Sequence, residues 1–201
     1  MGGYLAVEFF YILSGVFLGQ YIMTKNNVPP NIIKENFEYC SKRYISIFPY
    51  LLVSTFVGII VLKFTYDWQI SINRVFDIFG DIFLLQSFGV RVASITGIIW
   101  YLSSMFIAIW IIYPLARKHY KWYAYYISPF IVFTIMGLLI NNYGSLNVPA
   151  NYLFGIICTG NLRAISMISF GIFNNAISGT MIKNRTYNKD IYFLSCVEVL
   201  I

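Results

Sequence analysis

Long apolar stretches alternate along the chain with short segments rich in Lys and Arg. Five stretches are long enough, at about 1.5 Å per helical residue, to cross a hydrocarbon core of about 30 Å. They are residues 4–23, 44–62, 97–116, 122–140 and 164–182. The pattern therefore predicts an all-α fold, a polytopic transmembrane helical bundle with about five full spans.

Other segments fit a full crossing less well. Residues 75–90 are apolar but short, and they contain Asp77 and Asp81 one helical turn apart, which predicts a re-entrant or interfacial segment. Residues 31–39 predict a short interfacial helix, and residues 152–158 predict a shallow dip into the bilayer. Residues 191–201 resemble the first half of a truncated sixth span.

The basic segments predict an orientation. They follow the first, third and fifth spans, so the positive-inside rule places them in the cytoplasm. Residues 64–96, residues 141–163 and the amino terminus would then lie outside. An external amino terminus without a signal indicates that a helix is missing upstream. We therefore expect residues 1–201 to be a single transmembrane domain that is a fragment of a larger membrane protein.

The composition agrees with a membrane protein. Of the 201 residues 59% are hydrophobic and 11% are charged, against about 25% charged in soluble domains, and the mean hydropathy is +0.69. The net charge of +6 reflects the basic segments, so we predict a lipid bilayer as partner and no nucleic acid. Cys40, Cys158 and Cys196 are widely spaced and predict buried, inert thiols without a disulfide or metal site.

The first span contains a carboxylate. On a helix Glu8 shares one side with Tyr11, Gly15 and Gly19. A carboxylate facing lipid costs roughly 2.5–3.5 kcal/mol, so this face should point into a bundle or a wet cavity. The Gly15 and Gly19 spacing would allow another helix to approach closely. We expect that neighbour to be a helix outside this chain. Glu8 is either a functional group or a buried carboxylate satisfied by its neighbours.

Three motifs resemble the acyltransferase 3 family of integral membrane acyltransferases. GGYLAVEFFYILSGVFLG at residues 2–19 is similar to that family's G-x-x-G/A-V-E/D-x-F-F-x-L-S-G-F signature. The matching positions are Val7, Glu8, Phe10, Leu13, Ser14 and Gly15. SKRYISIFP at residues 41–49 is similar to R-x-x-R-I-x-P, where Arg43 and Pro49 match but Ser46 replaces the second Arg.

The third motif is WYLSSMFIA at residues 100–108 with Pro114, which resembles W-x-L-S-x-x-x-x-A followed by Pro. Met105 stands where many members have Glu. A weaker match joins Arg163 to the segment at residues 169–171. The motifs together span most of the chain.

The resemblance implies an enzyme with about ten or more membrane helices, located in the cell membrane as a multi-pass protein of the bacterial plasma membrane. It would be an O-acetyltransferase that takes acetyl from acetyl-CoA, or an acyl group from another acyl-CoA, without a metal. The acceptor would be a hydroxyl of an extracytoplasmic glycan or lipid-linked sugar. The family's catalytic His would lie on the helix before residue 2, so this fragment is expected to be inactive.

The resemblance assigns Glu8 as the catalytic residue that orients this His or stabilises a cation, with Arg43 and Arg163 as substrate-binding residues. Arg43 could bind acetyl-CoA phosphates at the cytoplasmic rim or only set topology. Arg163 could contact an anionic lipid carrier or glycan, or could be a snorkelling anchor. Ser14 could be a nucleophile, but a Ser packed against a neighbouring helix is the simpler interpretation.

Other polar residues favour structural interpretations. Asp77 and Asp81 could contact a sugar or act as a base, but a solvated or interfacial face is the favoured interpretation. His119 lies in a basic turn and predicts a solvated charge cluster. Tyr123, Tyr125 and Tyr126 predict an aromatic belt.

Two other function classes remain open. A transporter or flippase of lipid-linked sugars would use Glu8 for proton coupling without acyl chemistry, and repeated halves or further spans without His would favour it. A small structural membrane protein is the third interpretation, and Glu8 and the truncated last span argue against it.

Overall fold

The computed structural model describes residues 3–25, 29–65, 72–88, 99–144, 152–153 and 157–183. The helices are α1 (Gly3–Thr24), α2 (Ile32–Thr65), α3 (Ile72–Ile82), α4 (Trp100–Lys118), α5 (Tyr120–Trp122), α6 (Ser128–Tyr143) and α7 (Thr159–Lys183). A 3-10 turn, η1 (Leu85–Phe88), follows α3, and a π-helical segment, η2 (Tyr123–Ile127), joins α5 to α6. Strands β1 (Tyr152–Leu153) and β2 (Ile157–Cys158) pair antiparallel ahead of α7.

Four helical runs are long and apolar enough to cross a membrane, by length and composition. They are Leu5–Thr24, Ile32–Val61, Trp100–Lys118 and Tyr120–Tyr143. The predicted helical fold is thereby confirmed among the described residues, with four helical runs that could span a membrane. The fifth predicted span falls in α7, which starts at Thr159 and is richer in Ser and Asn. The predicted sixth span, residues 191–201, lies outside the described residues.

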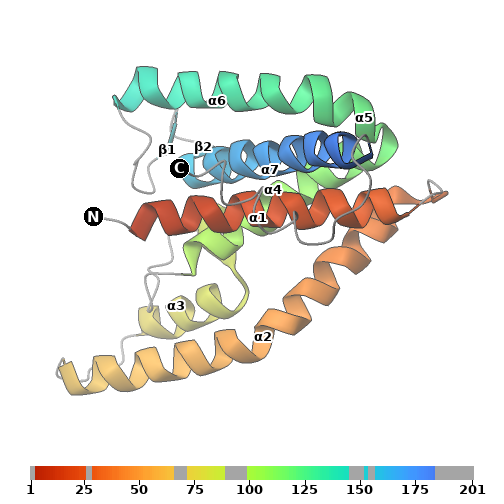
Figure 1. The fold of residues 1–201 in the computed structure, drawn as a ribbon. Helices are drawn as coiled ribbons and strands as arrows, with labels where there is room; N and C mark the ends of the chain where they lie inside the picture. Colours follow the sequence, from red (N-terminus) through yellow and green to blue (C-terminus); the bar gives the residue numbers. More distant parts are fainter. Residues whose placement is uncertain are drawn as a thin grey trace.

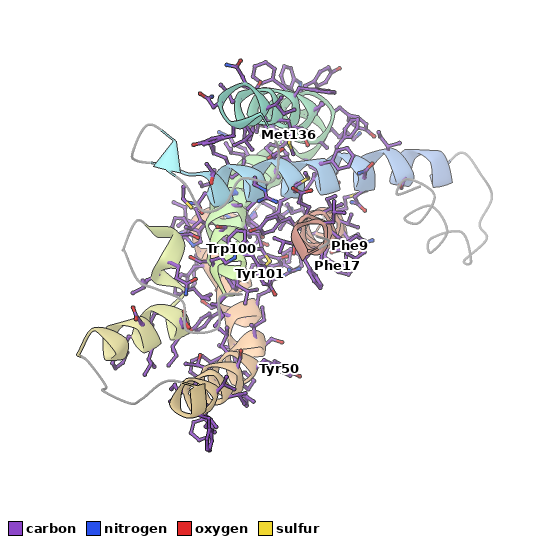
Figure 2. All side chains as sticks on the ribbon, turned by 90° about the vertical axis from the view of Figure 1, so that its left-hand side faces the viewer. Phe9, Phe17, Tyr50, Trp100, Tyr101 and Met136 are labelled. Atoms are coloured by element: carbon purple, nitrogen blue, oxygen red, sulfur yellow. The ribbon has the colours of Figure 1, made fainter. Side chains whose placement is uncertain are left out.

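Helix α7 is the central element of the bundle. It packs against α1, α4 and α6, and Figure 1 shows it between α6 and α1. Buried Ile168 and Ile172 on α7 join Leu18 of α1 and Ile109 of α4 in one apolar core. Phe9 and Phe17 on α1 and Tyr50 on α2 project outward (Figure 2), as apolar side chains do when lipid surrounds a helix.

Helices α1 and α7 approach closely because glycines face each other. A Cβ on Gly15 would lie 2.1 Å from the Ile168 carbonyl oxygen, and one on Gly171 would lie 2.2 Å from the Ile12 carbonyl oxygen. Gly19 likewise packs on the Asn175 side chain. The expected close approach at Gly15 and Gly19 is confirmed. The expectation that the neighbour lies outside this chain was wrong, because α7 is that neighbour.

Helix α2 is continuous from Ile32, so the separate interfacial helix expected at residues 31–39 was wrong. Pro49 lies inside α2. The first half of α2 is fixed to α4, where the Asn36 amide donates to the Trp110 carbonyl oxygen at 3.0 Å. The second half leaves the bundle with α3 beside it (Figure 1), and its exposed residues include Phe56.

The structure differs from the expectation in two places, the tyrosine-rich segment at Tyr123 and the acidic segment at Asp81. Tyr123, expected in an aromatic belt, is fully buried, and its hydroxyl lies 2.8 Å from the Ser169 hydroxyl. The wide turn of η2 precedes Pro129, and one helical run continues from Tyr120 to Tyr143 through both. Asp81, expected on a solvated face, is fully buried. Residues 152–158, expected as a dip, are described only as β1 and β2.

Candidate functional site

Glu8 and Arg163 form an ion pair inside the bundle. The Arg163 Nη2 atom donates to Glu8 Oε1 at 2.8 Å, and the side chains of Arg163 and Glu8 are 3% and 12% exposed. Glu8 lies in the second turn of α1 and Arg163 in the second turn of α7, at the end of the bundle where both helices begin. Two of the three expected site residues therefore meet in one buried pair. Arg163 is not a snorkelling anchor.

Buried hydroxyls continue from the ion pair along α1. Tyr11, three residues after Glu8, is fully buried and donates to the Tyr101 carbonyl oxygen of α4 at 3.2 Å. Ser14 follows on the same side and donates to the Met105 sulfur at 3.2 Å. Ser14 therefore packs against a neighbouring helix, as the simpler interpretation predicted. Met105 stands at the position where many members of the resembled family have Glu.

A second group of polar side chains joins η1, α4 and α7 near the same end. The Ser87 and Ser104 hydroxyls lie 2.8 Å apart, and the Ser103 hydroxyl bonds to the Leu84 carbonyl oxygen. The Asn161 amide of α7 donates to the Ser87 carbonyl oxygen at 3.0 Å. These contacts hold η1 against the first turns of α4 and α7. No sequence pattern indicated Ser87 or Asn161, because their partners are far apart in the chain.

We call Glu8, Tyr11, Ser104, Asn161 and Arg163 the outer polar cluster, because the positive-inside rule predicts that this end of the bundle faces outside. Among the described residues, the Asn161 Oδ1 and Ser166 Oγ atoms are buried on α7 and make no hydrogen bond. Burying such an atom without a partner costs roughly 1–3 kcal/mol, and lipid offers none. The described residues therefore leave these two oxygen atoms of α7 without a hydrogen-bond donor.

Arg43 lies apart from this cluster. Its guanidinium carbon is 4.8 Å from the centroid of the Tyr39 ring, a cation–π contact. Tyr39 in turn packs on Tyr113 of α4, with ring centroids 5.5 Å apart. Arg43 is eight residues beyond Glu35 on α2, about 12 Å along the helix axis. It therefore lies about two helical turns beyond Glu35 within α2.

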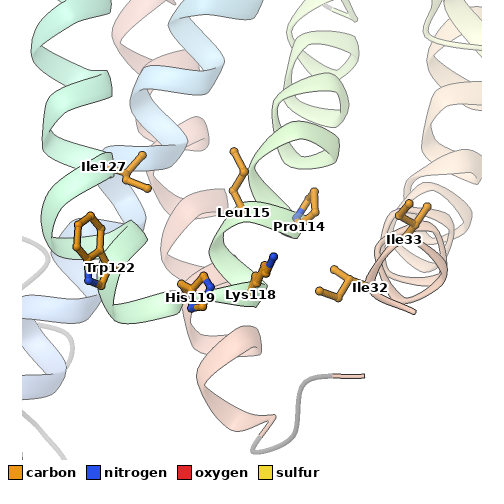
Figure 3. Close-up of a pocket in the computed structure, with 8 residues that line it drawn as sticks. All are labelled: Ile32, Ile33, Pro114, Leu115, Lys118, His119, Trp122 and Ile127. Carbon is orange, nitrogen blue, oxygen red and sulfur yellow. The ribbon is translucent and has the colours of Figure 1, made fainter. Parts of the chain in front are cut away.

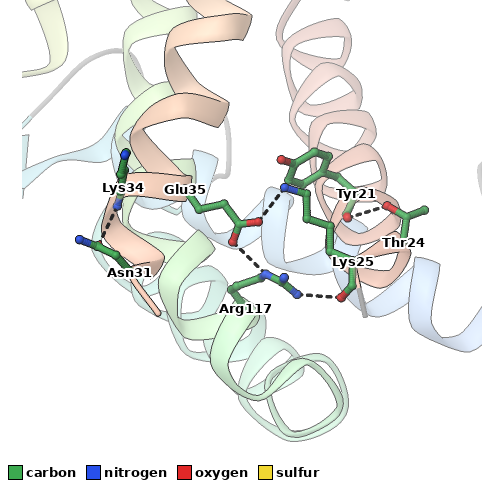
Figure 4. A network of polar contacts seen from close by, with 7 residues as sticks. All are labelled: Tyr21, Thr24, Lys25, Asn31, Lys34, Glu35 and Arg117. Atoms are coloured by element: carbon green, nitrogen blue, oxygen red, sulfur yellow. Dashed lines mark hydrogen bonds and ion pairs between the residues drawn. The ribbon is translucent and has the colours of Figure 1, made fainter. Parts of the chain in front are cut away.

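Glu35 forms a charge network that sequence reasoning missed, at the opposite end of α1 from Glu8. Glu35 accepts from Lys25 Nζ at 2.8 Å and from Arg117 Nε at 3.0 Å (Figure 4). Arg117 Nη1 also donates to the Lys25 carbonyl oxygen at 3.0 Å. The network joins the end of α1, the first turn of α2 and the last turn of α4. In the sequence Glu35 is only one acid within a mixed polar segment.

The Glu35 network responds to alkaline pH. The hydrogen bond to Glu35 raises the pKa of Lys25 above its ordinary value of 10.5. A raised pKa means that the folded state holds the proton more tightly than the unfolded chain. The resulting stabilisation is fully present below the ordinary pKa, and it is lost as the pH rises through the raised value. Neutral pH therefore leaves the network intact.

The structure also places the other residues that the sequence singled out. His119 is exposed between α4 and α5, at the same end as Lys25, as its assignment to a solvated charge cluster predicted. Cys40 and Cys158 are buried free thiols, as expected, and Cys196 lies outside the described residues. Asp81 accepts from the Gln86 amide within the α3–η1 turn.

Comparison with known proteins identifies no relative: no family model, no curated protein and no solved structure matches this chain.

Proposed function

We propose that this chain is part of a membrane-bound O-acetyltransferase that moves an acyl group from cytoplasmic acyl-CoA to a hydroxyl of an extracytoplasmic or lipid-linked glycan. The observation that supports the proposal is the buried ion pair between Glu8 and Arg163. Ionisable residues inside a membrane bundle are costly and mark functional sites by default. Both residues also belong to segments that resemble the acyltransferase 3 family.

The packing of the resembling segments supports the same proposal. Glu8 of the first motif pairs with Arg163, and Ser14 of that motif contacts Met105 of the third. Gly15 packs against Gly171, which ends the weakest of the matching segments. Segments that are distant in the sequence thus form one connected unit around the outer polar cluster. This connection is what a shared catalytic site requires.

The chemistry needs a base, an acceptor hydroxyl and a thioester. The base removes the hydroxyl proton, the hydroxyl oxygen attacks the thioester carbonyl carbon, and the CoA thiol leaves with a proton. In our proposal Glu8 orients the imidazole that serves as base and stabilises its cation, which contributes about 10²–10⁴-fold to the rate. The resemblance places that His outside residues 1–201. Arg163 holds the Glu8 carboxylate in place through a charge-assisted hydrogen bond.

In this proposal the other polar residues bind the two substrates, some the sugar and one the acyl-CoA. Asn161 and Ser166, whose buried oxygens lack protein partners among the described residues, would accept hydrogen bonds from the sugar hydroxyls. Arg43 would bind the phosphates of the acyl-CoA from within α2, because a guanidinium pairs with phosphate oxygens in a bidentate way. Its contact with the Tyr39 ring fixes it for this role.

The test is acyl transfer from radiolabelled acetyl-CoA in inverted membrane vesicles that contain the source organism's glycans. We compare the 201-residue chain with a form extended upstream by its genomic sequence. The extended form should label glycan, and Glu8→Gln should lower its rate by about 10²-fold or more. Glu38→Gln, an exposed acid on α2, is the matched control and should retain the rate.

Three outcomes would count against the proposal. An extended form that labels no glycan would remove the acyltransferase assignment. Equal rates for Glu8→Gln and the unsubstituted form would remove Glu8 from catalysis. Full activity of the 201-residue chain would show that no upstream His is needed.

A transporter or flippase of lipid-linked sugars is the second candidate, and the same ion pair favours it, since paired carboxylates inside membranes also serve proton relays. Such a protein would move the sugar lipid across vesicles without acyl-CoA. Flux that depends on Glu8 but not on acyl-CoA would select this candidate over the enzyme.

A further inference from the structure

An open hollow of about 440 Å³ lies at the end of the bundle opposite the outer polar cluster. Figure 3 shows it between the first turn of α2, the last turn of α4 and the segment formed by α5 and η2. Most of its wall is apolar and comes from Ile32, Ile33, Pro114, Leu115, Trp122 and Ile127. Lys118 and His119 complete the lining.

The charge at this hollow is positive. Lys118 and His119 are both exposed at its rim, and exposed Lys121 follows within one turn. None of the eight lining residues is acidic. Glu35, the acid of the same α2 turn, is already bound by Lys25 and Arg117, so its charge is compensated. An occupant with an apolar body and an anionic end is therefore complementary to this site.

The exposed aromatic and aliphatic side chains that line the hollow indicate the membrane depth at which an occupant would lie. Trp122 is 66% exposed and Leu115 is 52% exposed, although both line the hollow. Trp side chains prefer the level of lipid headgroups, where the ring is apolar and its N–H can meet water. Lys118 and His119 precede Trp122 by four and three residues and line the same hollow, so they share this interfacial level.

We propose that this hollow binds one anionic phospholipid of the adjoining leaflet. An acyl chain lies along Ile33, Leu115 and Ile127, and the phosphate is held by the Lys118 ammonium and a His119 N–H. Basic pockets between membrane helices bind such headgroups. This lipid site is separate from the outer polar cluster, and it stands whether or not the chain is an acyltransferase.

Quenching of Trp122 fluorescence by brominated lipids tests the proposal. The test variant keeps Trp122 and changes Trp68, Trp100 and Trp110 to Phe, while a matched control keeps only Trp110, an exposed residue elsewhere on α4. Each is reconstituted in phosphatidylcholine with an equal minor fraction of dibromo-phosphatidylglycerol or dibromo-phosphatidylcholine. Circular dichroism confirms the helical fold.

The expected result is a preference confined to Trp122. Near Trp122, brominated phosphatidylglycerol should bind more tightly than brominated phosphatidylcholine. We expect a factor of about five for each positively charged side chain that contacts the headgroup. The two lipids should quench Trp110 equally. Lys118→Gln with His119→Gln should abolish the preference, whereas Lys34→Gln, an exposed cation nearby on α2, should retain it. Native mass spectrometry of the unsubstituted chain should show the same lipid preference.

Three results would overturn the proposal. Equal quenching of Trp122 by both lipids, or a preference that survives the double substitution, would show that Lys118 and His119 bind no headgroup. Quenching of Trp110 but not of Trp122 would show that protein rather than lipid covers the hollow.

Discussion

Glu8 and Arg163 are 155 positions apart in the chain, and their side chains meet at 2.8 Å in the interior. Removing one partner of a buried ion pair leaves the other charge without its counter-charge, at a cost of about 3–5 kcal/mol. We therefore expect Glu8→Gln to lower the free energy of unfolding by that amount. Unfolding in mixed micelles with a denaturing detergent, followed by circular dichroism, measures the change.

A double-mutant cycle isolates the pair from other effects of Glu8→Gln. If the pair is formed, Glu8→Gln combined with Arg163→Gln should cost less than the sum of the two single losses, because the two residues interact directly. Glu38→Gln, on the exposed face of α2, should change stability by no more than about 0.5 kcal/mol. Strictly additive single losses would contradict the ion pair.

The sequence could select these two residues but could not pair them. A carboxylate inside an apolar span stands out because of its cost, and this alone directed attention to Glu8. No periodicity relates Glu8 to Arg163, since their contact depends on how α1 and α7 pack. Asp81 was misjudged for the same reason: its burial depends on the turn that brings η1 against α4.

At the scale of elements, the crossing of α1 and α7 depends on glycine. A Cβ on Gly15 would lie 2.1 Å from the Ile168 carbonyl oxygen, which belongs to rigid helical backbone, so the helices would have to separate. We expect Gly15→Ala to lower the free energy of unfolding by about 1–3 kcal/mol, as overpacked cores do. The same micelle unfolding experiment measures it.

Gly137 on α6 provides the matched control for Gly15. A Cβ there would meet nothing within 4 Å, so Gly137→Ala adds helix propensity without a clash. It should raise stability by about 0.5–1 kcal/mol. Similar effects of the two substitutions would contradict a close glycine-mediated crossing of α1 and α7.

Hydropathy predicted the existence of the spans better than their ends. Length and apolar content place α1, α4 and the helical run Tyr120–Tyr143 within a few residues, because lipid imposes these features on the sequence. The sequence predicted two helices in place of α2 because its first turns are polar. Asn36 and Glu35 instead form hydrogen bonds to α4, and α2 is continuous through them. Polar residues that find partners in the tertiary fold do not end a helix.

At the scale of the whole molecule, the bundle has two chemically different ends. The end where α1 and α7 begin contains the outer polar cluster around Glu8 and Arg163. The other end contains the network of Lys25, Glu35 and Arg117 and the exposed cations Lys118 and Lys121. The proposed acyl acceptor site and the proposed lipid site therefore face opposite leaflets.

The positive-inside rule predicts that the end with Lys118 and Lys121 faces the cytoplasm. The helical run Tyr120–Tyr143 is long and apolar enough to connect the two ends in a single crossing, so labelling at its termini tests the orientation. In a background with the three native cysteines changed to Ala, Asn141→Cys should react with a membrane-impermeant thiol reagent in intact spheroplasts. Lys121→Cys, the matched position at the other terminus, should react only after permeabilisation. The reverse pattern would place the outer polar cluster in the cytoplasm and would contradict transfer to an extracytoplasmic acceptor.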